Sequence, residues 1–243
     1  MLVVFNLGIL ISALGTILGA LPALLLTNVT HRIKDNLLAY SAGIMVAAST
    51  YALIPSTLKL SNMFVLVIGI LLGTATLTLL EISLPHLEMD HSVHANHKTS
   101  PLLLIAAMAI HNIPEGMSVG ISYASELEDL GSLVSFSIGI QNIPEGFLVC
   151  LFLITNQIPR VQALLFTAFT AGIEWVSSFI GLQLSGQHLD IIPYGLAFAA
   201  GSMLFVVYKE LIPESHGDGN ERSATFSFVI GLLTMIFITD VTR

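Results

Sequence analysis

The chain has 243 residues, of which 54% are hydrophobic and only 10% are charged, and its mean hydropathy is +0.87. Soluble domains carry roughly 25% charged residues, so lipid must solvate most of this surface and a soluble fold is excluded. The formal net charge of −8 is the opposite of the basic footprint of a nucleic-acid-binding protein, and no nucleic-acid partner is expected.

Long apolar stretches recur along the chain, and each is long enough for a transmembrane helix, which needs about 20 residues. We expect a single all-α membrane domain over 1–243 with eight helices that cross the lipid bilayer. The stretches are too long for barrel strands and do not alternate, which excludes a β-barrel. In chain order the predicted spans are 2–26, 37–58, 63–84, 101–122, 132–154, 161–184, 191–212 and 224–240.

The connection between spans three and four, about 85–100, is the longest and is rich in histidine. Short His-rich tracts are typical of metal binding, although a disordered polar connector remains an alternative for each residue alone. The histidines are His86, His91, His94 and His97.

The basic residues predict the orientation of the spans. Six of the eight Lys and Arg residues fall on one side, and only Lys59 and Arg243 fall on the other. Because positive charge gathers on the cytoplasmic side, we expect both termini outside and the histidine-rich loop in the cytoplasm of a multi-pass protein of the cell membrane. The six are Arg32, Lys34, Lys98, Arg160, Lys209 and Arg222.

Two internal repeats relate spans that run in opposite directions. Residues 110–116 read Ile-His-Asn-Ile-Pro-Glu-Gly and 140–146 read Ile-Gln-Asn-Ile-Pro-Glu-Gly, so six of seven positions match. Spans two and seven share a second pattern at an offset of 158, including Leu-Ile-Pro at 53–55 and 211–213. Inverted repeats of this kind place an ion site near the membrane midplane. Packing alone remains an alternative for the shared Ala and Gly positions.

Several polar side chains lie near the centres of spans four, five and six. A carboxylate there costs about 2.5–3.5 kcal/mol or more unless it is compensated, and these central segments contain no Lys or Arg. A bound cation is the expected compensation, although the two asparagines are also suited to hydrogen bonding between helices. The residues are His111, Asn112, Glu115, Gln141, Asn142, Glu145 and Glu174.

The spacing of these residues suits metal ligation. His111 and Glu115 are four residues apart and share a helix face, as do Gln141 and Glu145. Imidazole with carboxylate and no thiolate suits zinc, and also iron, manganese, cobalt, nickel or cadmium. Two carboxylates on facing helices could also bridge two metals, about 3.5–4 Å apart.

At these residues the chain resembles the ZIP family of metal transporters. The resemblance rests on the paired motif at 110–116 and 140–146 and on Glu174. It implies a 3+2+3 helical arrangement, metal bound between spans four and five, movement of metal toward the cytoplasm, and often a homodimer. Many members have His where this chain has Gln141, and an amide is a weaker zinc ligand.

Carried over by position, the resemblance implies two neighbouring metal sites. One would comprise His111, Glu115, Gln141 and Glu145. The other would comprise Asn112, Glu115, Asn142, Glu145 and Glu174.

Two acids near the cytoplasmic end of span seven are candidate exit ligands. Glu210 and Glu214 are one helical turn apart, and their counterparts in span two are the neutral Ala52 and Ser56. The alternative is that Glu210 pairs with a basic neighbour and that Glu214 belongs to an ordinary polar turn.

Taken together, these features predict a transporter of divalent metal ions, zinc first, and not an enzyme. The metal is the transported substrate, and no catalytic cofactor is expected. An intramembrane metalloenzyme is the main alternative, but the chain has no His-Glu-x-x-His motif, and a catalytic zinc site usually has three protein ligands and an open position. A metal sensor without transport is a third reading.

Overall fold

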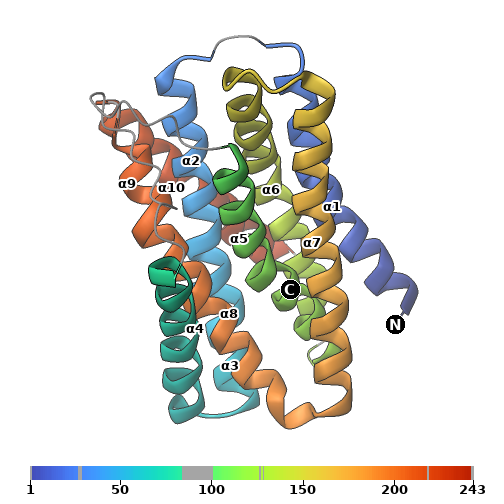
Figure 1. Ribbon diagram of the computed structural model, residues 1–243. Coiled ribbons are helices and arrows are strands. Elements are labelled where there is room, and N and C mark those ends of the chain that lie inside the picture. Colours follow the sequence, from blue (N-terminus) through green and yellow to red (C-terminus); the bar gives the residue numbers. More distant parts are fainter. Residues whose placement is uncertain are drawn as a thin grey trace.

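The computed structural model describes the chain except residues 1, 27–28, 84–100, 126, 128, 218 and 242–243, and the described part contains helices but no strands (Figure 1). Two π-helical segments, Ala48–Leu53 and Val207–Leu211, and a 3₁₀ turn, Leu189–Ile191, adjoin the α-helices. The α-helices are α1 (Leu2–Ala23), α2 (His31–Ala47), α3 (Ile54–Leu60), α4 (Met63–Ser83), α5 (Pro101–Ala124), α6 (Leu130–Thr155), α7 (Arg160–Gln187), α8 (Ile192–Val206), α9 (Ile212–Ser215) and α10 (Glu221–Val241).

Several of these elements join into continuous helices. α2 runs through a π-helical segment into α3, so that His31–Leu60 is one helix, and Leu189–Ser215 likewise joins α8 to α9. The described residues therefore form eight helical rods, and each predicted span corresponds to one of them. Six of the rods are long and apolar enough to cross a membrane, and α1 contains a shorter apolar stretch, Leu7–Ala23.

The two π-helical segments occupy equivalent positions in the repeat that relates spans two and seven. The backbone N–H of Ile54 donates to the carbonyl of Ser49, and that of Ile212 donates to the carbonyl of Val207. Each bond spans five residues and directly precedes a proline, Pro55 or Pro213, whose ring interferes with regular α-helical bonding. The repeat thus includes a shared backbone distortion at the offset of 158 residues.

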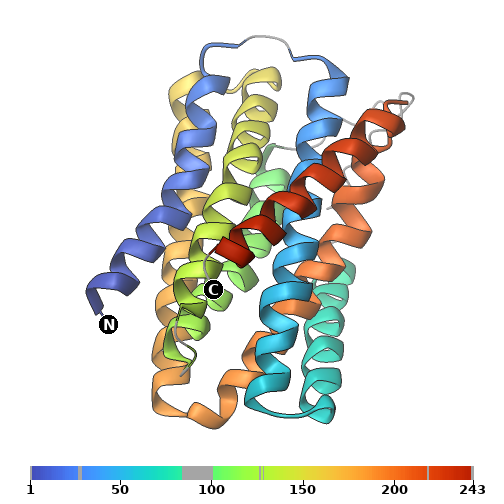
Figure 2. The same ribbon diagram turned by 180° about the vertical axis from the view of Figure 1, so that it is seen from behind.

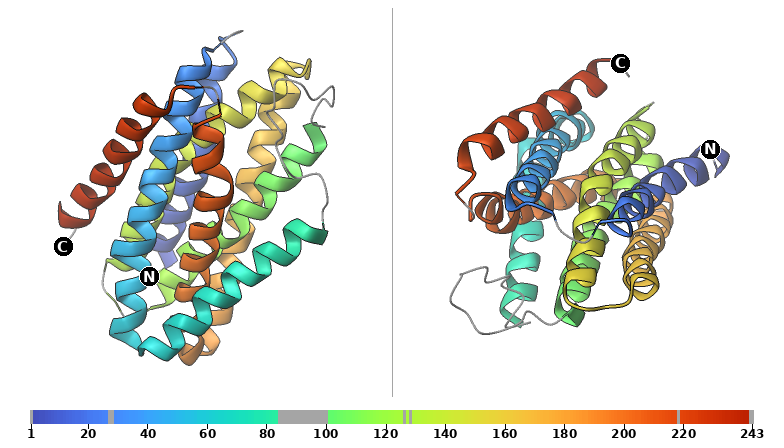
Figure 3. Two further views of the ribbon diagram at one scale, coloured as in Figure 1. Left: turned by 90° about the vertical axis from the view of Figure 1, so that its left-hand side faces the viewer. Right: turned by 90° about the horizontal axis from the view of Figure 1, so that it is seen from above.

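The helices form two groups of four rods. In the first group, the site group, α1 packs along α6 and α5 packs along α7. In the second, the support group, α10 packs along α2 and α4 packs along α8. The two groups lie side by side when seen from above (Figure 3), and α10 crosses the outer face of α2 (Figure 2). They meet mainly where α5 contacts α8 and α2 contacts α6.

The glycines of the paired motif allow close helix packing in the site group. A Cβ added to Gly116 would lie 2.2 Å from the carbonyl oxygen of Glu174 on α7, and one added to Gly146 would lie 2.0 Å from the carbonyl oxygen of Thr16 on α1. Real Cβ atoms do not come so close. Each motif glycine therefore admits a neighbouring backbone.

Candidate metal site

The site group carries all of the predicted midplane residues. α5 and α6 continue through Pro114 and Pro144 without a break, so each motif keeps its helical face. Six of the seven side chains belong to residues that are at least nine-tenths buried, and the His111 side chain is 12% exposed. The buried six are Asn112, Glu115, Gln141, Asn142, Glu145 and Glu174.

Gln141 lies between two of the carboxylates. Its Nε2 donates one hydrogen bond to Oε1 of Glu115 and another, 3.3 Å long, to Oε1 of Glu145. The amide N–H groups of Gln141 therefore occupy the space between Glu115 and Glu145, where a cation would neutralise both carboxylates. Oε2 of Glu115 and Oε1 of Gln141 are buried without a hydrogen-bond partner, and such oxygens are costly unless they bind something.

Glu174 and Asn142 form a second polar cluster beside the first. Nδ2 of Asn142 donates to Oε2 of Glu174 at 2.8 Å and to the backbone oxygen of Ser12, on α1, at 3.0 Å. The other carboxylate oxygen of Glu174 is buried and unpartnered. Asn112 instead donates to the backbone oxygen of Thr170 at 2.8 Å. The two asparagines thus also join neighbouring helices, as the alternative reading of their amides expects.

These groups could hold a metal through oxygen and imidazole ligands. The part of the chain that the structure describes has no three His, Cys, Asp or Glu side chains grouped as a ready-made ligand cluster, which is consistent with the Gln141 amide lying between Glu115 and Glu145. A metal between these carboxylates would replace the two N–H contacts. Gln141 would then present Oε1, because its amide carries an acceptor as well as donors.

His111 connects the site group to the support group. Its Nε2 lies 3.0 Å from Oε2 of Glu210, which belongs to the π-helical segment between α8 and α9. A second polar contact across the same boundary runs from Oγ of Ser41 to the backbone oxygen of Gln141, at 3.4 Å. Glu210 was expected at an exit from the site, and the structure places it against one of the proposed metal ligands.

Glu214, the other candidate exit residue, is paired with a lysine. Its Oε1 lies 3.1 Å from Nζ of Lys34, near the start of α2. The sequence pattern does not predict this pair, because Lys34 and Glu214 belong to different spans. The four predicted loop ligands, His86, His91, His94 and His97, lie outside the described residues.

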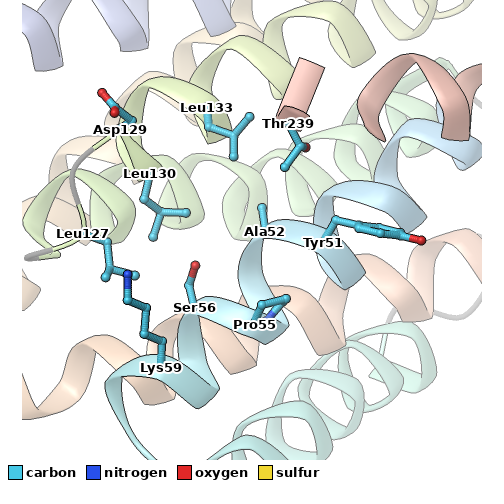
Figure 4. Close-up of a pocket in the computed structure, with 10 residues that line it drawn as sticks. All are labelled: Tyr51, Ala52, Pro55, Ser56, Lys59, Leu127, Asp129, Leu130, Leu133 and Thr239. Carbon is cyan, nitrogen blue, oxygen red and sulfur yellow. The ribbon is translucent and has the colours of Figure 1, made fainter. Parts of the chain in front are cut away.

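A cavity of about 270 Å³ lies between α3 and the start of α6, at the other end of the helix His31–Leu60 from Lys34. Figure 4 shows ten residues that line it. Polar and apolar residues share the lining, and Tyr51, Ser56, Lys59, Asp129 and Thr239 are the five that carry polar side chains. None of the proposed metal ligands lines this cavity, and the buried Val134 and Ile138 lie between Leu133 and Gln141 along α6. The lining residues are Tyr51, Ala52, Pro55, Ser56, Lys59, Leu127, Asp129, Leu130, Leu133 and Thr239.

Comparison with known proteins identifies related chains. Residues 82–239, which include both copies of the paired motif and Glu174, match the family described as ZIP Zinc transporter. The chain is 32% identical to the zinc transporter GufA of Myxococcus xanthus, over 94% of this chain and 95% of GufA. It is 31% identical to the zinc transporter ZIPB of Bordetella bronchiseptica, over 92% of this chain and 76% of ZIPB. It is 24% identical to the zinc transporter ZupT of Streptococcus mutans, over 93% of this chain and 92% of ZupT.

Proposed function

The chain belongs to the ZIP zinc transporter family, and from this premise we propose that metal ions cross the membrane through the polar clusters between α5, α6 and α7 and leave toward the cytoplasm. The chain transports divalent metal ions, zinc first among them, and the metal is cargo rather than a catalytic cofactor. Membership in a transporter family favours transport over the alternative of intramembrane hydrolysis.

The observation that carries the proposed site is the presence of three buried carboxylates that hydrogen-bond to the amides of Gln141 and Asn142. Glu115, Glu145 and Glu174 belong to three packed helices, and both Glu115 and Glu174 retain a buried oxygen without a partner. The sequence has no Lys or Arg between Lys98 and Arg160, so α5 and α6 supply no permanently charged cation to compensate them. A divalent cation would supply the missing charge.

Two ions fit the two polar clusters. His111, Glu115, Gln141 and Glu145 would ligate one ion. Asn112, Glu115, Asn142, Glu145 and Glu174 would ligate the other, with the two glutamates of the motif shared. Two-metal sites in proteins hold their ions about 3.5–4 Å apart, and carboxylates shared by both ions would fit such a spacing.

The topology that we propose has eight spans, with both termini outside the cell and a 3+2+3 arrangement in a single domain. The distribution of Lys and Arg supports this orientation. The shared π-helical distortion in the second and seventh rods supports the inverted repeat. A homodimer is part of the proposal and follows from the family resemblance alone.

The proposed exit begins at Glu210 and continues to Glu214. The contact of Glu210 with His111 joins this exit to the first cluster, and Glu214 lies one turn further along the same rod. The histidines at 86, 91, 94 and 97 would raise the local capture of ions on the cytoplasmic side.

Uptake by purified protein in liposomes tests the proposed function. Zinc should enter and be detected by a fluorescent indicator trapped inside, and iron, manganese, cobalt and cadmium should compete with it to different extents. Protein that binds zinc but moves none would support a sensor instead.

A further inference from the structure

Beyond the proposed site, the bundle holds a partly buried ion pair at the end of the proposed exit. Nζ of Lys34 lies 3.1 Å from Oε1 of Glu214, and the side chains are 26% and 9% exposed. Charges this sheltered attract each other more strongly than a surface pair does, because water screens them less. Both residues belong to the support group, so the pair does not depend on how the two groups meet.

The position of Lys34 is not explained by its own helix. Lys34 is the fourth residue of α2, and a helix N-terminus carries a partial positive charge that disfavours a cation there. No acidic residue in the first turn of α2 offsets it. The carboxylate of Glu214, 3.1 Å from the ammonium, provides an opposite charge at this position.

The pair stands at the end of the series of side chains that we propose as metal ligands. Nε2 of His111 is 3.0 Å from Glu210, and Glu214 follows Glu210 after one helical turn. An ion that leaves along this series reaches Glu214 last, where it meets the Lys34 ammonium. Conduction needs sites that bind an ion strongly enough to admit it and weakly enough to release it.

We propose that Lys34 is a release residue, whose ammonium competes with the departing divalent metal for the Glu214 carboxylate and so prevents the ion from being retained there. The inference rests on the proposed function, because it assumes an exit past Glu210. Lysine suits this role, since its ammonium is a compact point charge on a flexible stem and can withdraw and return.

If Lys34 has only a structural role, the expected effect of replacing it differs from the effect expected of a release residue. If the pair only fastens α2 to α9, its loss lowers thermal stability without changing how many ions the protein holds. If Lys34 competes with metal, its loss exposes a new ligand and adds a bound ion. The number of zinc ions per chain therefore separates the two roles.

The test measures zinc binding by the full chain in detergent and zinc uptake by the same protein in liposomes. Lys34→Gln should bind about one more zinc ion per chain and take up zinc about twofold or more slowly, because an ion held harder leaves more slowly. Lys34→Gln with Glu214→Gln should lose the additional ion. Lys59→Gln, at the opposite end of the bundle, is the matched control and should behave as the native chain does.

Lys34→Cys provides a second route if Lys34→Gln does not fold. Alkylation of the new thiol with 2-bromoethylamine restores a cation at the same place, and the native Cys150 is fully buried. The additional zinc ion should be present before alkylation and absent after it. An unchanged zinc count and rate in Lys34→Gln, or an additional ion that persists when Glu214 is also replaced, would overturn the inference.

Glu115→Ala separates this inference from the proposed function. If native protein transports zinc, Glu115→Ala does not, and Lys34→Gln matches the native chain, only the role of Lys34 is wrong. If Glu115→Ala transports normally, the proposed site itself is wrong.

Discussion

Nε2 of His111 lies 3.0 Å from Oε2 of Glu210, and this contact joins the two four-rod groups of the bundle. An imidazole nitrogen bonds either to a carboxylate through a proton or to a metal through its lone pair. Metal bound at His111 Nε2 would therefore displace this contact with Glu210. The displaced carboxylate would then be available as the next ligand on the exit.

Replacing both candidate exit carboxylates should slow transport while sparing the buried site. We expect Glu210→Gln with Glu214→Gln to lower the rate of zinc uptake by about threefold or more, because ions then leave without intermediate ligands. Zinc affinity in detergent should remain almost unchanged, since the buried carboxylates are intact. Transport at the native rate would mean that the exit lies elsewhere. Replacing the four loop histidines by Ser should have a smaller effect.

The sequence predicts the helices of this protein better than it predicts the contacts within the proposed site. The eight rods were predictable because helices must satisfy every backbone group within lipid, and the apolar stretches mark their length. The proximity of Glu115 to Gln141 was foreseeable from the repeated motif. The contact of His111 with Glu210 was not, because it joins rods distant in the chain that share no motif.

The division of the rods into two groups also left no clear signal in the sequence. In a membrane protein the faces that meet lipid and the faces that meet other helices are both apolar, so hydrophobic periodicity does not separate them. The π-helical segments were likewise not predicted. Their prolines were visible, but a proline can break, kink or widen a helix.

A histidine in place of Gln141 should strengthen zinc binding. Imidazole is the better zinc ligand, so Gln141→His should raise affinity by about tenfold, equivalent to about 1.4 kcal/mol. It need not speed uptake, because tighter binding slows release. Calorimetry in detergent measures the affinity directly. Unchanged or weaker binding would remove Gln141 from the ligand set.

The motif glycine of α6 should be sensitive to a single methyl group. A Cβ at Gly146 would meet the Thr16 carbonyl oxygen at 2.0 Å, and overpacking of this kind costs about 1–3 kcal/mol. Gly146→Ala should therefore lower the unfolding temperature in detergent. Gly172→Ala is the matched control, since a Cβ at that helical position meets nothing within 4 Å. Equal stability of the two variants would contradict the close packing of α1 on α6.

Labelling of introduced cysteines tests the proposed orientation. Ser61 lies between α3 and α4, and Thr155 ends α6 at the other end of the bundle. With both termini outside, Ser61→Cys should react with an impermeant reagent added to intact cells, and Thr155→Cys should react only after the cells are opened. Reaction of both from outside would refute the eight-span topology.

Zinc uptake by Glu115→Ala and Glu145→Ala proteins in liposomes tests the central claim most directly. Each variant should fall to the level of liposomes without protein, because each removes a carboxylate shared by both proposed ion sites. Asp190→Ala, which removes an exposed acid, should transport as the native chain does. Near-normal uptake by either glutamate variant, at equal incorporation into the liposomes, would contradict the buried carboxylate site.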